Sequence, residues 1–213
     1  RAQGKIEGEH HGWQYDEYTK KTFLLVDDGR FFLHGMIWLG AEFYPPFVDK
    51  VLERLGDKEV VQDSNGRKVL VYKRSRSGYM PEYMDHPVKD MLSWEELCRW
   101  RLDPDTRQRY MDLDKRIPEA IEAAHRGTMI VQKLCGGYMY LRSLIGPQAL
   151  FYMFYDDPEL IHACMRQWLA VADAVVAYHQ KYITLDELFF GEDINNNKGP
   201  LISTDMIREF LLP

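Results

Sequence analysis

Apolar and polar residues alternate in short runs along the first third of the chain, which is the pattern of β-strands. Residues 23–26 and 31–39 are short apolar runs, and both are predicted to be strands. Residues 59–73 alternate on either side of Asn65-Gly66, a dipeptide that favours the tight turn of a β-hairpin. Pro45-Pro46, followed by residues 47–55, predicts a short helix that ends at Gly56.

From Tyr79 onward the apolar residues recur at helical spacing. Ser93 and Glu96 have the spacing of a capping box, which predicts a helix start at Ser93. The elements predicted after it are a helix at 118–125 that stops at Gly127, a strand at 128–134 that enters Cys135-Gly136-Gly137, and helices at 141–155 and 158–181. This β-α-α-β-α order is typical of an α/β barrel with inserted helices.

The next predicted strand ends in two adjacent carboxylates. Residues 185–190 form an apolar run that reads as a buried strand, and Glu192 and Asp193 follow it directly. Barrel enzymes place their chemistry at the carboxyl ends of their strands, so this pair is a candidate site. A helix should follow the polar loop, with Ser203 as its N-cap and Asp205 in its first turn.

Several short motifs occur in an order shared with a known superfamily. They are Tyr44-Pro45-Pro46-Phe47, Tyr83 to Asp90 with Trp94, Leu102-Asp103-Pro104-Asp105 with Arg109-Tyr110, Gly136-Gly137, Gly146, Asp156 to Leu160, and the acidic strand with its loop and helix from Phe189 to Pro213. Together they resemble the uroporphyrinogen decarboxylase superfamily, closest to its corrinoid-dependent methyltransferase branch. The resemblance runs from about Tyr44 to Pro213.

That resemblance implies a (β/α)8 TIM barrel. Such a barrel needs about 250 residues, so we expect residues 1–213 to be a single, incomplete barrel domain, cut at both ends. Residues 1–76 would supply N-terminal strands, a helix and a hairpin, and residues 79–213 the βα portion. We also expect such a segment to self-associate through unpaired strand edges.

The resemblance leaves two chemistries and a binding role open. The methyltransferase branch implies methyl transfer from a methylated corrinoid to a thiol, with a corrinoid protein or free corrinoid and a small acceptor as partners. It also implies zinc, with ligands beyond Pro213. The alternatives are cofactor-free decarboxylation of uroporphyrinogen and non-catalytic binding of a corrinoid or porphyrinoid.

Departures from the decarboxylase pattern favour methyl transfer. The position of that enzyme's catalytic tyrosine falls on Leu144, and Gly78 stands where its second arginine should be. In that enzyme the later strand ends in an acidic residue followed by serine, whereas this chain has Glu192-Asp193 at the same place. An added carboxylate there would repel a polyanionic porphyrinogen.

Individual candidates have structural alternatives. Glu192 and Asp193 are the catalytic candidates, although both could instead bind loop amides. Tyr138, Tyr140 and Asn195 are the candidates for cofactor binding. The two tyrosines belong to an aromatic stripe that could equally be core, and Asn195 could equally serve a left-handed turn. No metal ligand is assigned within the chain.

Composition limits the partners and the compartment. Hydrophobic residues make up 46% and charged residues 28% of the chain, as in ordinary globular domains, and the net charge of -6 argues against a nucleic-acid surface. Three dispersed cysteines favour a reducing, cytoplasmic environment. We expect no membrane segment, and a homodimer is compatible with this composition.

Overall fold

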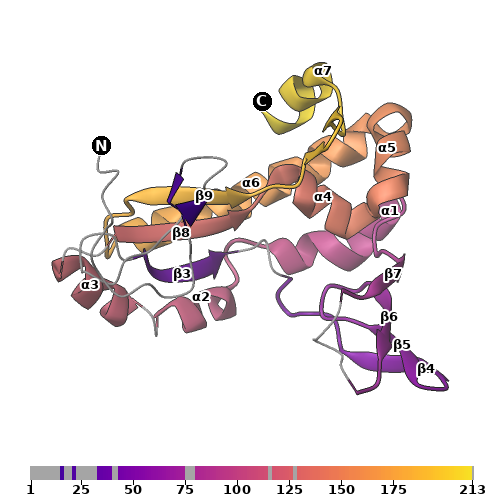
Figure 1. Cartoon of the computed structure of the whole chain (residues 1–213), viewed down its shortest axis with the longest axis horizontal. Coiled ribbons are helices and arrows are strands. Elements are labelled where there is room, and N and C mark those ends of the chain that lie inside the picture. Colours follow the sequence, from indigo (N-terminus) through magenta and orange to yellow (C-terminus); the bar gives the residue numbers. More distant parts are fainter. Residues whose placement is uncertain are drawn as a thin grey trace.

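The computed structural model of the chain describes residues 15–16, 21–22, 33–39, 43–74, 80–114, 117–126 and 129–212 (Figure 1). Near the N-terminus, β1 (Tyr15–Asp16) and β2 (Lys21–Thr22) form a short antiparallel pair. The strand predicted at residues 23–26 lies outside the described residues, as do Gly78, Gly127 and Pro213.

A three-stranded parallel sheet is the part of the fold that leads to the candidate site (Figure 1). It consists of β3 (Leu33–Leu39), β8 (Met129–Cys135) and β9 (Glu187–Gly191), in the order β3-β8-β9. The strands predicted at 31–39 and 128–134 are therefore confirmed. Ile130, Val131 and Leu134 on the central strand β8 are buried, as expected for a parallel strand covered on both faces.

Strand β9 differs from its prediction in being exposed. Leu188, Phe189 and Phe190 are 42%, 45% and 47% exposed, although the apolar run predicted a buried strand. The physical reason is its position. Among the described residues β9 pairs only with β8, so it forms an edge of the sheet.

Three helices connect β8 to β9. They are α4 (Gly137–Ile145), α5 (Pro147–Asp156) and α6 (Pro158–Gln180). The predicted helix at 141–155 thus begins four residues earlier and is broken at Gly146, whose φ of 96° ends α4. Asp157 caps α6 by accepting a hydrogen bond from the Leu160 amide at 3.1 Å.

Helix α6 is long and apolar enough to cross a membrane when judged by length and composition alone. Seven of its residues are buried in this structure, including Leu160, Ile161 and Cys164. A core helix of a globular protein passes the same test, so the helix carries little evidence for a membrane span.

The helical segment before α2 has Asp90 as its N-cap. The capping box predicted at Ser93 and Glu96 is therefore wrong. The Asp90 side chain accepts from the Ser93 amide at 2.7 Å, and the Ser93 hydroxyl accepts from the Asp90 amide at 3.0 Å. Ser93 is therefore the third helical residue of a box whose N-cap is Asp90. The segment continues through α1 (Met91–Ser93), the π-helical η1 (Trp94–Cys98) and the 3-10 helix η2 (Arg99–Leu102).

Two further helices precede β8. Helix α3 (Ile117–His125) confirms the helix predicted at 118–125. Helix α2 (Arg107–Asp114) was not predicted, and its polar sequence offers no clear apolar face. Figure 1 shows both on the side of the parallel sheet away from α4 and α5.

A four-stranded antiparallel sheet projects from the helical part of the molecule (Figure 1). Its strands are β4 (Lys50–Leu55), β5 (Lys58–Gln62), β6 (Lys68–Tyr72) and β7 (Glu82–Asp85), in sequential order. The hairpin at Asn65-Gly66 is confirmed, with Gly66 at φ 79°.

The helix predicted at 47–55 is wrong, because residues 50–55 are strand β4. Gly56, which was expected to end the helix, instead adopts φ 59° in the turn between β4 and β5. Backbone pairing with β5 decides the conformation, and a short apolar run is ambiguous between strand and helix without that partner.

Backbone and side-chain hydrogen bonds attach this sheet to the helices. The Val88 amide donates to the Leu144 carbonyl at 3.1 Å, and His86 Nδ1–H donates to the Ser143 carbonyl at 2.9 Å. Arg67 Nη1 donates to the Ser143 hydroxyl at 3.2 Å. The end of α4 therefore holds both the hairpin and the segment before α1.

The chain after β9 forms a loop and a final helical turn. The two-residue strands β10 (Asn195–Asn196) and β11 (Gly199–Pro200) pair within the loop. Ser203 caps α7 (Thr204–Met206) by accepting from the Met206 amide at 3.1 Å, as predicted, and η3 (Ile207–Leu211) follows. The described residues form helices and small sheets without a closed barrel, and the (β/α)8 barrel stays a prediction.

Replacing Gly146 by alanine should destabilise the fold more than the same change at Gly199. Both glycines have positive φ, 96° and 132°, and a side chain in such a conformation costs about 1–3 kcal/mol. A Cβ at Gly146 would also lie 2.7 Å from the His86 ring, whereas one at Gly199 meets nothing within 4 Å. Urea unfolding should therefore show the larger loss for Gly146→Ala, and equal losses would contradict this packing.

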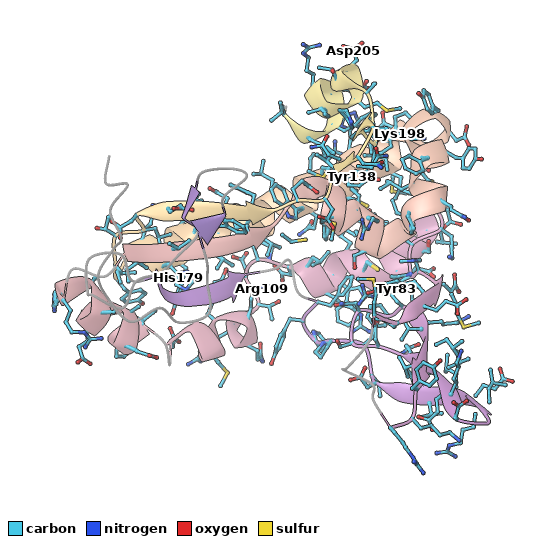
Figure 2. All side chains as sticks on the ribbon, in the orientation of Figure 1. Tyr83, Arg109, Tyr138, His179, Lys198 and Asp205 are labelled. Atoms are coloured by element: carbon cyan, nitrogen blue, oxygen red, sulfur yellow. The ribbon has the colours of Figure 1, made fainter. Side chains whose placement is uncertain are left out.

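His179 should make the stability of the fold depend on pH. It is completely buried beside the sheet (Figure 2), its Nδ1 lies 3.0 Å from Gln132 Oε1, and burial lowers its pKa to about 4 against an opposing effect of Asp114. The unfolded chain has the higher histidine pKa, about 6.5, so it takes up the proton first as pH falls.

Unfolding free energy should consequently decrease between about pH 6.5 and pH 4, by roughly 3 kcal/mol from this residue. Urea titrations at several pH values measure this slope. The unfolding free energy of His179→Gln should change less with pH over the same interval. His125, at the end of α3, supplies the matched control, because His125→Gln should leave the slope in place.

Candidate active site

The ends of β8 and β9 lie side by side at the candidate site. Cys135 pairs with Gly191 in the parallel register, and the Gly136 amide donates to the Gly191 carbonyl at 2.7 Å. Glu192 and Asp193 follow immediately, so the structure places both at the carboxyl end of the sheet.

Glu192 binds the N-terminus of helix α4. Its Oε2 accepts from the Tyr138 amide at 3.0 Å, and its Oε1 accepts from the Met139 amide at 2.9 Å. Both amides belong to the first turn of α4, where backbone N–H groups have no partner within the helix. A carboxylate is favoured there by these donors and by the helix dipole. Glu192 thus binds backbone amides, as one alternative from the sequence proposed, but these amides belong to a helix and not to a loop.

Gly136 makes this contact possible. A Cβ on Gly136 would lie 2.2 Å from Glu192 Oε2 and 2.8 Å from the Gly191 carbonyl oxygen. Only glycine leaves room for the carboxylate to reach the helix from the neighbouring strand.

Burial raises the pKa of Glu192 and outweighs its hydrogen bonds. The amides of Tyr138, Met139 and Asp193 act in the opposite direction, and the nearby charge of Asp193 adds to the increase. The pKa of Glu192 therefore lies above the ordinary value of a glutamate.

Asp193 is exposed, as Glu192 is, and lies near a guanidinium group. Its side chain is 71% exposed, and Asp193 Oδ2 lies 4.0 Å from Nη1 of Arg142 on α4. Arg142 was not among the site residues predicted from the sequence. Its position could have indicated a place near the site, because it stands four residues after Tyr138 in a helix that begins directly after β8.

The tyrosines proposed to bind a cofactor are part of the core. Tyr138 is completely buried and Tyr140 is 5% exposed, and both pack in the cluster formed by α4, α5, α6 and η1 (Figure 2). Neither hydroxyl has a hydrogen-bond partner in the part of the chain that the structure describes. Burial raises the pKa of both phenols. Neither ring is available at the surface to a flat cofactor.

Asn195 is exposed and lies in the small β10–β11 ladder, where it pairs with Pro200. Asn195 lies in the same loop as Asp193. It does not lie with the two tyrosines, so the residues expected to bind a cofactor are divided between the core and the surface.

Zinc does not fit the described residues. In the described ranges no group of three His, Cys, Asp or Glu side chains could hold a metal ion. Cys98 and Cys164 lie in helical segments and are buried, and burial raises the pKa of Cys98 to about 12 and that of Cys164 further. Burial therefore disfavours the thiolate form, which is the form that zinc binds.

The sequence contains one His-x-Cys, His162-Ala163-Cys164. It lies within α6, where residues two apart point in different directions. Cys164 is buried, while the His162 ring packs on Phe210 with ring centroids 4.8 Å apart, and its Nε2 is 4.0 Å from Glu209 Oε1. These two side chains do not share a ligand position.

Comparison with known proteins finds no matching family model, no similar curated protein and no similar solved structure.

Removing the Glu192 carboxylate should destabilise the fold. Glu192→Ala leaves two first-turn amides of α4 without their acceptor, and losing such a cap costs about 1–2 kcal/mol. Asp193→Ala is the matched control, and its side chain is exposed, so the change should stay within about 0.5 kcal/mol. Urea unfolding of both variants checks the difference. Equal stabilities for Glu192→Ala and the original chain would show that the carboxylate is not a cap.

Proposed function

We propose that the chain belongs to an enzyme of the uroporphyrinogen decarboxylase type, and that its reaction is methyl transfer to a small acceptor such as a thiol. The observation that carries the proposal is the pair Glu192-Asp193 at the carboxyl end of β9, next to the carboxyl end of β8. This is the edge of a parallel sheet where α/β enzymes bind and convert ligands.

The charge around Asp193 favours methyl transfer over decarboxylation. Asp193 and Glu192 contribute two carboxyl groups, and the Arg142 guanidinium lies 4.0 Å from the Asp193 carboxylate. A substrate with several carboxylates would meet repulsion at this position. A neutral thiol or a cationic acceptor would not.

The two carboxylates have different roles in this proposal. Glu192 is a positioning residue, because its bonds to Tyr138 and Met139 hold the end of β9 against α4. Asp193 is the group that touches the acceptor, by accepting a hydrogen bond from its S–H or N–H group. Arg142 attracts the Asp193 carboxylate and so holds that side chain near α4. Methyl donor and zinc are implied by the resemblance alone, and no step here is assigned to them.

Methyl transfer is testable with methylcobalamin as the donor and 2-mercaptoethanol as the acceptor. We expect loss of the methylcorrinoid absorbance at a rate that depends on protein and thiol concentration. Release of CO2 from uroporphyrinogen, with no loss of methylcobalamin, would instead support decarboxylation. Corrinoid binding without turnover would support the non-catalytic alternative.

Asp193→Asn should lower turnover by roughly 10- to 100-fold, the range for losing a carboxylate that supports a reacting group. The change keeps the shape of the side chain and removes its charge, so the melting temperature should change little. Asp205→Asn is the matched control. Its side chain is 92% exposed in the first turn of α7, at the top of the view in Figure 2. The change should leave turnover unchanged.

A stability loss of about 1 kcal/mol with intact turnover would assign Asp193 to the turn and remove it from the site. Turnover and unfolding are therefore measured on the same Asp193→Asn preparation.

A further inference from the structure

The start of helix α4 receives two segments of the chain. Its first amides bind the Glu192 carboxylate at the end of β9. Its first residue, Gly137, lies against Leu211 at the end of η3, because a Cβ on Gly137 would be 3.3 Å from Leu211 Cδ2. The segment from Glu192 to Leu211 is therefore closed at both of its ends by the same helix start.

Two adjacent glycines make this closure possible. A Cβ on Gly136 would lie 2.2 Å from Glu192 Oε2, and a Cβ on Gly137 would lie 2.6 Å from Met165 Cε in addition to its contact with Leu211. Glycine allows another part of the chain to approach the backbone this closely. Gly136 thus admits the beginning of the segment, and Gly137 admits its end.

Phe210 fixes the end of the segment in the core. It is buried, and the centroid of its ring lies 5.1 Å from that of Phe154 on α5 and 4.8 Å from that of His162 on α6. Aromatic pairs at such distances contribute more stability than the area they bury. Leu211 and Phe210 together attach η3 to three helices, α4, α5 and α6.

The segment is also paired within itself. Strands β10 and β11 pair in the antiparallel sense, and the Leu201 amide donates to the Ile194 carbonyl at 2.8 Å. Ile202 is buried in the same apolar cluster as Phe210. A loop with its two ends close together and packed by its own side chains is a compact unit, and such loops frequently carry functional residues.

We propose that Leu211 and Phe210 are positioning residues of the candidate site. They hold the end of the closed segment against α4, and the segment in turn holds Asp193 and Asn195 in place beside the ends of β8 and β9. Side chains of a site are positioned precisely when the residues that support them are locked by packing. The anchoring itself is independent of any reaction, whereas its effect on turnover rests on the proposed function.

The competing arrangement is a lid, in which the same segment opens and closes over a ligand. Hydrogen exchange of the Leu201 amide distinguishes the two, because this amide is protected only while the segment is closed. It should exchange slowly in the original chain. In Leu211→Ala it should exchange about tenfold faster, a factor that corresponds to about 1.4 kcal/mol of lost contact. Unprotected exchange at Leu201 in the original chain would refute the anchored segment.

Val175→Ala is the matched control, and the Ile183 amide is the second reporter. Val175 is buried in the later part of α6, and the Ile183 amide donates to the His179 carbonyl close by. Local openings occur independently of one another. Val175→Ala should therefore speed exchange at Ile183 and not at Leu201, and Leu211→Ala should do the reverse. Equal acceleration of both amides in both variants would show that Leu211 supports only the fold.

Leu211→Met supplies the rescue. Methionine fills a similar volume on Gly137, so exchange at Leu201 should return to the slow rate of the original chain. Exchange in Leu211→Met as fast as in Leu211→Ala would contradict an anchor that acts by packing.

Steady-state kinetics with methylcobalamin and 2-mercaptoethanol test the effect on the site. The double variant Phe210→Leu/Leu211→Ala weakens both anchors, so its segment is closed for a smaller fraction of the time. The KM for the thiol should rise as that fraction falls, with kcat nearly unchanged. An unchanged KM together with fast exchange at Leu201 would overturn the positioning role. If no methyl transfer occurs at all, the proposed reaction fails, while hydrogen exchange still decides the anchoring.

Discussion

The contact between the Glu192 carboxylate and the first amides of α4 is the constraint on which the candidate site depends. It joins the end of β9 to the helix that follows β8, two segments more than fifty residues apart. The contact requires a glycine at position 136, because any Cβ there would occupy the space of the carboxylate. The next residue, Asp193, is the acidic group of the pair that lies near Arg142. One carboxylate is used for structure so that its neighbour is held at a defined edge of the sheet.

The helical cluster behind this contact gives it a rigid base. Tyr138 and Leu141 of α4 are completely buried against α5, α6 and η1, so the helix whose N-terminus receives Glu192 cannot shift easily. The other end of α4 binds His86 and Arg67 through Ser143, and thereby fixes the antiparallel sheet. Helix α4 is thus the element that connects the two sheets of the molecule, and it explains why Gly146, directly after it, packs so closely on His86.

Much of the secondary structure could be predicted where local signals were strong. The Asn65-Gly66 turn, the apolar run into Cys135 and the Ser203 cap were all confirmed, because each depends on residues close together in the chain. The capping box was misplaced by three residues, since both Asp90 and Ser93 are good caps and only the backbone conformation distinguishes them. Residues 50–55 became a strand because β5 offers a pairing partner that no local pattern reveals.

The sequence by itself determined that an acidic pair follows a strand and that helices and strands both occur in the chain. Which of the two carboxylates binds backbone amides was decided only by tertiary structure, because that depends on where the N-terminus of α4 lies relative to β9. The same holds for Tyr138 and Tyr140. An aromatic stripe has the same pattern whether it lines a pocket or a core, and packing against α5, α6 and η1 placed both in the core. Composition and periodicity report what a residue prefers, while long-range contacts decide which neighbours it meets.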